Sequence, residues 1–230
     1  MRYQAALRSE PAGTYKADAN VTTENNVIDI IQNIRSDIPM GRQLEFDRVS
    51  ALDQAVLLFW RRGYDGVGID DVVLASGASR YGLYAVFGDK RELFLAAIER
   101  YANAYLAPLL GPLAAEGADL GSIRRYFEAL AKLADAPLGE WGCLLCNSMV
   151  DKSAKTITGK FAKQFRDRLD GLFAHAVKNA ISRSQIPANH DAIAMARRLR
   201  TLAIAISLGA ASGESGDNLG IIAESTLAAL

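Results

Sequence analysis

The sequence predicts an all-α protein: a small N-terminal helical unit followed by a larger helical domain. Apolar residues recur at helical spacing from Asp47 to the end of the chain. No stretch keeps the strict alternation of a β-strand for long enough to compete. Glycines, prolines and capping residues divide the pattern into separate helices. With 230 residues, half of them hydrophobic, the chain is large enough for two cores, so we expect two folded domains.

Composition limits the kinds of function that the chain can have. The net charge is zero, which argues against a polybasic surface, so any affinity for DNA must come from a few placed cations. No run approaches the roughly 18 apolar residues of a membrane span, and the N-terminus lacks the pattern of a secretion signal. Two cysteines fit a reducing compartment better than a disulfide scaffold. We therefore expect a cytoplasmic protein without a membrane partner.

Residues 1–40 differ in composition from the rest of the chain. They mix Ser, Thr, Asn, Gly and Pro with little sustained periodicity, so we expect most of this extension to be disordered. Val27, Ile30, Ile31 and Ile34 do share one helical face, which could dock on the core or on a partner.

The first helix of the folded part follows Asp47. Its inner face is predicted to consist of Val49, Leu52, Val56, Phe59 and Trp60. We expect Trp60 to be a core residue rather than a ligand contact. Two arginines near the negative end of the helix and a glycine stop, in the order Arg61-Arg62-Gly63, end it.

Two short helices are predicted between Gly68 and Lys90, where the chain reads GIDDVVLASGASRYGLYAVFGDK. Gly68 can start the first, with Asp71 placed to meet its free N–H groups, so that helix runs from about Ile69 to Leu74. Gly77 supplies a residue that tolerates positive φ, and Ser79 can cap the second helix.

The second of these helices runs to about Val86, and Gly88 ends it. Asp89 and Glu92 form a capping box for a third helix that begins at Lys90. This layout is typical of a helix-turn-helix, in which the second helix lies in the major groove of DNA.

Residues 41–100 resemble the N-terminal domain of the tetracycline-repressor (TetR) family of bacterial regulators. The shared landmarks are Leu58-Phe59, Arg62-Gly63-Tyr64, Asp70-Asp71-Val72, Gly77, Leu83-Tyr84, Phe87, Lys90 and Leu93. The resemblance implies a transcriptional regulator without a cofactor, and most often a repressor that a small molecule releases from its operator. Nothing in these residues themselves fixes the sign of regulation.

The resemblance and the helix placement together give a set of candidate DNA contacts. They are Arg42, Gly68, Ser79, Arg80, Tyr81, Gly82, Tyr84 and Lys90.

Departures from the family pattern affect the same helix. Relatives carry a small residue at the position of Tyr81 and aromatic or His residues at those of Ala85 and Val86. Tyr81 can stack on or hydrogen-bond to a base or phosphate, whereas Ala85 and Val86 offer only apolar contact. Val73 also stands where an alanine usually lets the two helices approach. The operator preference of relatives therefore does not transfer to this chain.

The resemblance bears on the start of the chain as well. Similar proteins commonly begin near a G-R-x motif, and Met40-Gly41-Arg42 has this form. One interpretation is that Met40 is the true translation start; the other is that the first 39 residues are an additional arm.

Residues 101–230 are predicted to form the second domain. The helix that begins at Lys90 should run to about Leu106 and stop near Pro108. Further helices are expected around residues 123–133, after Gly142, and over about Thr156–Ser182, the last one roughly 40 Å long. Two thin, apolar helices follow, over Asp191–Ala211 and around 219–230. In the family such helices pair with their copies in a homodimer; the alternative is an internal core pair.

By resemblance, the second domain binds a small molecule between its helices, and the apolar composition predicts an apolar or aromatic effector. The candidate pocket residues are Tyr105, Phe127, Trp141, Asn147, Met149, Phe165, Phe173 and His175. Each of them is also a plausible core or surface residue, with Asn147 and Arg166 as possible polar anchors.

Cys143 and Cys146 lie three residues apart at a helix start. Such a pair can have a lowered thiol pKa and sense oxidants or electrophiles, although burial as small apolar residues is the commoner role. His175 and His190 carry no ligand spacing relative to the cysteines, so we expect no metal site.

Enzyme signatures are lacking. Gly66-Val67-Gly68 resembles part of a dinucleotide loop but has no third glycine and no preceding strand, and the chain has no G-x-S-x-G, H-E-x-x-H or P-loop motif. Two hypotheses remain. The first is a homodimeric regulator that binds an inverted-repeat operator. The second is a helical ligand- or redox-sensing dimer module with weak or lost DNA binding.

Overall fold

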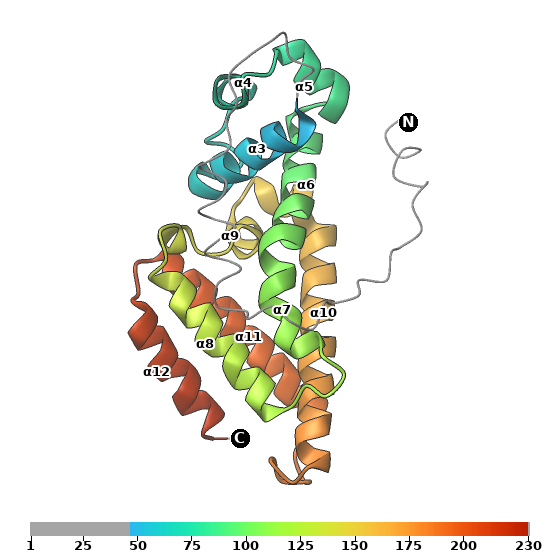
Figure 1. Ribbon diagram of the computed structural model, residues 1–230, viewed down its shortest axis with the longest axis vertical. Helices are drawn as coiled ribbons and strands as arrows, with labels where there is room; N and C mark the ends of the chain where they lie inside the picture. The colour runs from blue at the N-terminus through green and yellow to red at the C-terminus, as the bar shows by residue number, and fades with distance from the viewer. Residues whose placement is uncertain (1–46, 230) are drawn as a thin grey trace.

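The computed structural model describes residues 47–229, and within that range the regular secondary structure is entirely helical (Figure 1). The predicted all-α fold is confirmed. The predictions for the N-terminal extension, for Met40 and for Arg42 lie outside the described residues.

No described helix is long and apolar enough to cross a lipid bilayer.

Three helices occupy one end of the molecule (Figure 1). They are α3 (Arg48–Arg62), α4 (Ile69–Ser76) and α5 (Arg80–Phe87), and α6 (Lys90–Tyr101) leads away from them. Asp47 caps α3 by accepting a 2.9 Å hydrogen bond from the Val49 amide. The predicted bounds of α4 and α5 agree with the observed ones to within two residues.

The core of this unit forms where α3 packs along α6. The rings of Phe59 and Phe94 meet edge to face with their centroids 4.9 Å apart, and both side chains are fully buried. Arg100 and Asp53 join the same two helices through a 2.7 Å ion pair. Leu83 and Phe87 of α5 add to this core, so the short helix is held on its inner face.

The predicted helix stop near Pro108 is wrong. The chain passes from α6 through a π-helical turn, η1 (Ala102–Leu106), into α7 (Ala107–Ala114) without leaving the helical path (Figure 1). The wider π turn changes the hydrogen-bond register, and Pro108 falls in the first turn of α7, where its missing N–H is tolerated. One continuous rod therefore connects the two parts of the molecule.

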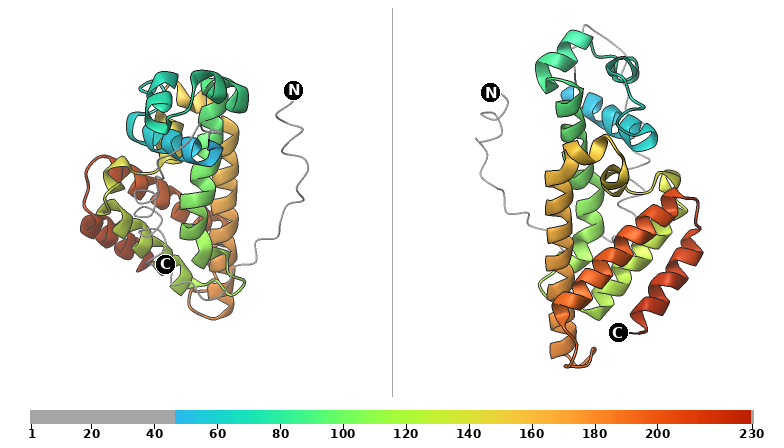
Figure 2. Two further views of the ribbon diagram at one scale, coloured as in Figure 1. Left: turned by 45° about the horizontal axis from the view of Figure 1, so that its top comes forward. Right: turned by 180° about the vertical axis from the view of Figure 1, so that it is seen from behind.

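The larger part contains the remaining long helices (Figure 2). These are α8 (Leu120–Ala134), α10 (Ala154–Ser182), α11 (Ala192–Ala211) and α12 (Gly216–Leu227). With 29 residues, α10 is about 43 Å long, as the sequence predicted. Phe127 of α8 and Phe173 of α10 stack in its core with ring centroids 5.8 Å apart.

Two short elements lie between the upper unit and the lower helices: η2 (Gly139–Trp141) and α9 (Leu144–Val150). Cys143, Leu144 and Leu145 belong to the same core as α3 and α6. The helix predicted after Gly142 thus packs under the N-terminal unit.

The apolar stripe of α11 packs within the chain. Leu199, Ala203 and Ile206 are buried in the core that α11 shares with α8 and α10. Gly209 allows α12 to come close, because a Cβ there would lie 2.9 Å from Leu219. The opposite face of α12 remains exposed.

Candidate functional site

The turn between α4 and α5 is fixed by local hydrogen bonds. The Gly68 amide donates to the Asp71 carboxylate at 2.6 Å, which closes the first turn of α4. Gly77 ends α4 in the left-handed region at φ 70°, with its amide bonded to the Val73 carbonyl at 3.0 Å. Ser79 then caps α5 by accepting a 2.9 Å hydrogen bond from the Gly82 amide. The caps predicted at Asp71, Gly77 and Ser79 are present.

Arg62, at the end of α3, holds α4 in place. Its guanidinium lies 2.9 Å from Asp71. The hydrogen bond from Arg62, followed by that from the Gly68 amide, lowers the pKa of Asp71 below its ordinary value. The Asp71 carboxylate therefore stays ionised while it serves both as a helix cap and as a link between helices.

Two aromatic side chains point outward from α5. Tyr81 is 85% exposed and Tyr84 is 43% exposed. Leu83 and Phe87 are buried on the opposite face, so α5 is fixed against the core while its outer face is exposed to solvent. Ala85 is exposed beside the two tyrosines. The surface that α5 offers is aromatic and carries few charges.

The cations near this surface have partners of their own. Arg80 forms an ion pair with Asp70 of α4, and both side chains are well exposed. Lys90 places its ammonium 4.4 Å from the centroid of the Tyr64 ring, in cation–π contact. Both cations are thus held at defined positions beside α5.

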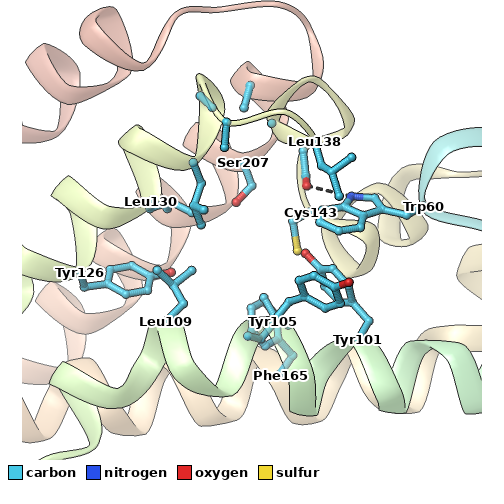
Figure 3. Close-up of a pocket in the computed structure, with 17 residues that line it drawn as sticks. Trp60, Tyr101, Tyr105, Leu109, Tyr126, Leu130, Leu138, Cys143, Phe165 and Ser207 are labelled. Carbon is cyan, nitrogen blue, oxygen red and sulfur yellow. Dashed lines mark hydrogen bonds between the residues drawn. The ribbon is translucent and has the colours of Figure 1, made fainter. Parts of the chain in front are cut away.

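A partly open cavity lies between the N-terminal unit and the lower helices (Figure 3). Its volume is about 70 Å³, several times the space that one ordered water needs. The aromatic lining comes from α3, α6, η1, α8 and α10: Trp60, Tyr101, Tyr105, Tyr126 and Phe165. No charged side chain is found among the described residues that line it. Such a cavity suits a small, largely apolar molecule.

Trp60 connects the cavity to the N-terminal unit. Its indole nitrogen donates a 2.9 Å hydrogen bond to the carbonyl of Gly142, and its ring packs against Tyr101, Tyr105 and Trp141 with centroids 4.9 to 5.7 Å apart. Trp60 is buried, as expected, and it also forms part of the cavity wall. A displacement of the Gly142 carbonyl would therefore also displace Trp60, near the end of α3.

The predicted pocket residues are not gathered in one place. Tyr105 and Phe165 line the cavity. Phe127 and Phe173 are buried in the lower core, and Trp141 packs on the outer side of Trp60. The Asn147 side chain donates to the Trp141 carbonyl at 2.6 Å.

The other two candidates lie further from the cavity. Arg166, the other candidate polar anchor, donates from its guanidinium to the Met149 sulfur at 3.9 Å. His175 is exposed, and its Nε2 lies 2.8 Å from the Glu116 carbonyl.

Several cavity residues escaped the sequence reasoning. Tyr101, Tyr126, Leu130 and Ser207 line the cavity, yet their spacing only marks them as inward-facing. Cys143, a candidate sensor residue because of its thiol, also lines the cavity. Among the described residues, no group of His, Cys, Asp and Glu side chains could hold a metal ion.

A helix-turn-helix unit joined by a continuous helix to a larger helical domain defines a class: the DNA-binding transcriptional regulators. Comparison with known proteins identifies the family. Residues 51–97 match the model of the bacterial regulatory proteins of the tetR family.

Two curated relatives support this assignment. The chain is 32% identical over 194 residues to the HTH-type transcriptional repressor ComR of Escherichia coli (strain K12), an alignment that covers 81% of this chain and 90% of ComR. It is 29% identical over 163 residues to the uncharacterised HTH-type transcriptional regulator YezE of Bacillus subtilis (strain 168), covering 70% and 84% of the two chains. The chain therefore belongs to the tetR family, and it is a transcriptional regulator rather than an enzyme.

Solved structures agree with the fold. The TetR-family regulator CifR superposes with a TM-score of 0.71 at 22% identity, covering 82% of this chain and 99% of CifR. A TetR regulator from Chloroflexus aurantiacus J-10-FL superposes with a TM-score of 0.66 at 26% identity, covering 79% and 92%. Both likenesses extend through the larger helical domain, well beyond residues 51–97.

Proposed function

We propose that this protein is a homodimeric repressor that binds an inverted-repeat operator through α5 and is released by a small apolar molecule. Residues 41–100 would form the DNA-binding domain, and residues 101–230 the effector-binding and dimerisation domain. The relative ComR is named a repressor, and CifR has been solved with a 26 base-pair operator DNA. Both facts support the proposal.

The observation that carries the proposal is the arrangement of α5. Leu83 and Phe87 are buried on its inner face, while Tyr81 and Tyr84 are exposed on its outer face. Exposed aromatic side chains at the start of a rigid recognition helix can stack on or hydrogen-bond to bases and phosphates. Gly68, Ser79 and Gly82 lie in the first turns of α4 and α5, where the positive end of each helix would favour a phosphate.

Fluorescence anisotropy with DNA that flanks the protein's own gene tests the proposal. We expect specific binding that weakens steeply with salt, because the contacts neutralise phosphates. Equal affinity for the flanking DNA and for unrelated DNA would instead favour a helical ligand- or redox-sensing dimer with lost DNA binding. The ion pair that occupies Arg80 gives that alternative its main support.

The cavity is positioned to control the DNA-binding unit. Its wall includes Trp60 of α3 and the α6–η1 rod. Helix α3 leads into the helix-turn-helix and α6 leads out of it. A ligand that fits better when these walls have shifted would favour a different placement of α3 and α5, and would move the two recognition helices of a dimer.

Removing Asp70 should strengthen DNA binding. The Asp70→Asn variant loses the carboxylate that holds Arg80 and that repels phosphates. We expect about three- to tenfold tighter binding at low salt, because Arg80 no longer has to leave an ion pair to reach the DNA and the repulsion between the carboxylate and the phosphates is gone.

Asp167→Asn is the matched control, because it also removes one exposed carboxylate from an ion pair, here with Lys163 on α10, away from α5. Anisotropy titrations at several salt concentrations measure both variants. If Asp70→Asn and Asp167→Asn bind alike, Arg80 is not a DNA contact.

The exposed face of α12 is the proposed dimer surface. Ile221 is 67% exposed there, next to the exposed Ile222, and such an apolar patch on a surface helix is typical of an interface. In a twofold interface, Ile221→Glu would introduce a buried charge on both sides.

We expect Ile221→Glu to halve the mass that light scattering measures after size-exclusion chromatography. Val150→Glu places the same charge at a 65% exposed site on α9 and should leave the mass unchanged. An unchanged dimer for Ile221→Glu would move the interface elsewhere.

A further inference from the structure

The cavity contains a nucleophile that simple apolar binding does not use. Cys143 lines the wall, and its sulfur points toward the hydroxyl group of Tyr101 (Figure 3). Both side chains are buried, and the Tyr101 hydroxyl lies close enough to lower the pKa of the Cys143 thiol. Cys146 lies one helical turn further on and does not line the cavity. The cavity therefore presents the Cys143 thiol beside the Tyr101 phenol, in a lining that carries no charged side chain.

The surroundings of Cys143 favour its thiolate. Its sulfur accepts a hydrogen bond from the Cys146 amide at 3.5 Å. The hydrogen bond from the Cys146 thiol, ahead of that from its amide and the one from the Tyr101 hydroxyl, lowers the pKa of Cys143. The pKa values of Cys146 and Tyr101 are both raised, mainly by their bond to Cys143 and by burial respectively, so these groups keep their protons. A thiolate is the reactive form of cysteine.

We propose that the cavity captures small, apolar α,β-unsaturated carbonyl compounds, which form a covalent thioether with Cys143. The capture stands on the geometry of the cavity, whereas its effect on DNA rests on the proposed function. The small volume and the uncharged, aromatic lining exclude bulky or ionic electrophiles. The Tyr101 hydroxyl beside the sulfur supplies a donor for the carbonyl oxygen of the captured molecule.

The chemistry balances without an oxidant or a reductant. The thiolate sulfur forms a bond to the β-carbon, the C=C π electrons move toward the carbonyl, and the oxygen takes the negative charge as an enolate. A hydrogen bond from Tyr101 stabilises that oxygen. The proton that left the thiol returns to the α-carbon. The product is the sum of the protein and one molecule of the enone, and nothing leaves.

The capture should perturb the link to the DNA-binding unit. Cys143 follows Gly142, whose carbonyl accepts the Trp60 hydrogen bond, and Tyr101 packs on the Trp60 ring. A thioether on Cys143 fills the space beside Trp60 and removes the hydrogen bonds that end on the thiolate. The Trp60 contacts would then have to rearrange, and with them the end of α3.

The experiment treats the full-length protein with 3-penten-2-one and reads intact mass after incubation with dithiothreitol. Dithiothreitol reverses disulfides but leaves a thioether. We expect one added enone per chain, located on Cys143 by peptide mapping, and none with the saturated analogue 2-pentanone. Cys143→Ser should block the addition and Cys146→Ser should retain it. Absence of an adduct on the native protein, or an adduct on Cys146 alone, would overturn the proposal.

Tyr101→Phe keeps the ring and removes only the hydroxyl. Without that hydrogen bond, we expect the pH at which alkylation reaches half its maximal rate to rise, and the rate near neutral pH to fall by about tenfold. Cys146, Tyr101 and Tyr126 interact with Cys143, and Tyr105 lines the same cavity; burial raises the pKa of all three tyrosines. A purely structural role for Tyr101 would leave the pH profile in place.

DNA binding is measured on the same samples. If the adducted protein binds the operator at least about fivefold more weakly while the Cys143→Ser protein does not respond, capture is coupled to release. Adduct formation with unchanged operator affinity would support the capture and overturn its regulatory role. Protein that never binds DNA would count against the proposed function, and the mass result would still decide the capture.

Discussion

Tyr81→Ala is expected to weaken operator binding by about 10- to 100-fold, the effect of losing one good contact to the DNA. Tyr81 is exposed at the start of α5, and its ring buries nothing within the chain. The loss should therefore appear in anisotropy titrations while the unfolding temperature stays the same. Arg80→Ala should also weaken binding, with a smaller salt slope, because a cation is lost.

Leu74→Ala is the control for Tyr81→Ala. Leu74 is 87% exposed on the neighbouring helix α4, so the control removes a similarly exposed large side chain outside the recognition helix. We expect it to change operator affinity by less than about threefold. Equal losses for Leu74→Ala and Tyr81→Ala would mean that α5 does not read the DNA.

Gly142→Ala is expected to lower the free energy of unfolding by roughly 2 to 5 kcal/mol, from backbone strain together with overpacking. Gly142 has φ 61° and ψ −140°, which side chains rarely adopt. A Cβ there would lie 2.6 Å from the Ser207 carbonyl and 2.7 Å from Ala211, so the segment must move away from α11. Urea unfolding followed by circular dichroism measures the loss.

Two other glycines serve as comparisons. Gly77 also has a positive φ, but it lies in the left-handed helical region (φ 70°, ψ 4°) with open space around it, so Gly77→Ala should cost only about 1 to 2 kcal/mol of strain. Gly111→Ala lies within α7 with nothing near its Cβ, and it should stabilise the protein by about 0.5 to 1 kcal/mol. A loss for Gly142→Ala no greater than that for Gly77→Ala would show that α11 does not press on this turn.

Local signals were sufficient to predict the helix-turn-helix. Asp71, Gly77, Ser79 and Asp89 act within a few residues of their own position, so their roles can be read from the chain itself, and the structure shows each of these caps. Pro108 shows where a local rule fails. The π turn before Pro108 contains Tyr105 and Leu106, which are buried in the core. No single residue type in the sequence predicts such a turn.

The cavity depends on contacts between distant segments. Trp60, Tyr101 and Cys143 come together although more than 80 residues separate the first from the last. Spacing marks the first two as inward-facing but does not distinguish a packed interior from the wall of a cavity. His175 illustrates the converse, because a side chain with useful chemistry lies at the surface beside the Glu116 carbonyl.

A DNase I footprint on the promoter of the protein's own gene tests the central claim most directly. A twofold dimer that reads DNA through α5 should protect an inverted repeat with its half-sites about one helical turn, or a multiple of it, apart. The Tyr81→Ala protein should lose both half-sites together. Protection of a single unrepeated site, or a footprint that Tyr81→Ala leaves unchanged, would contradict the account.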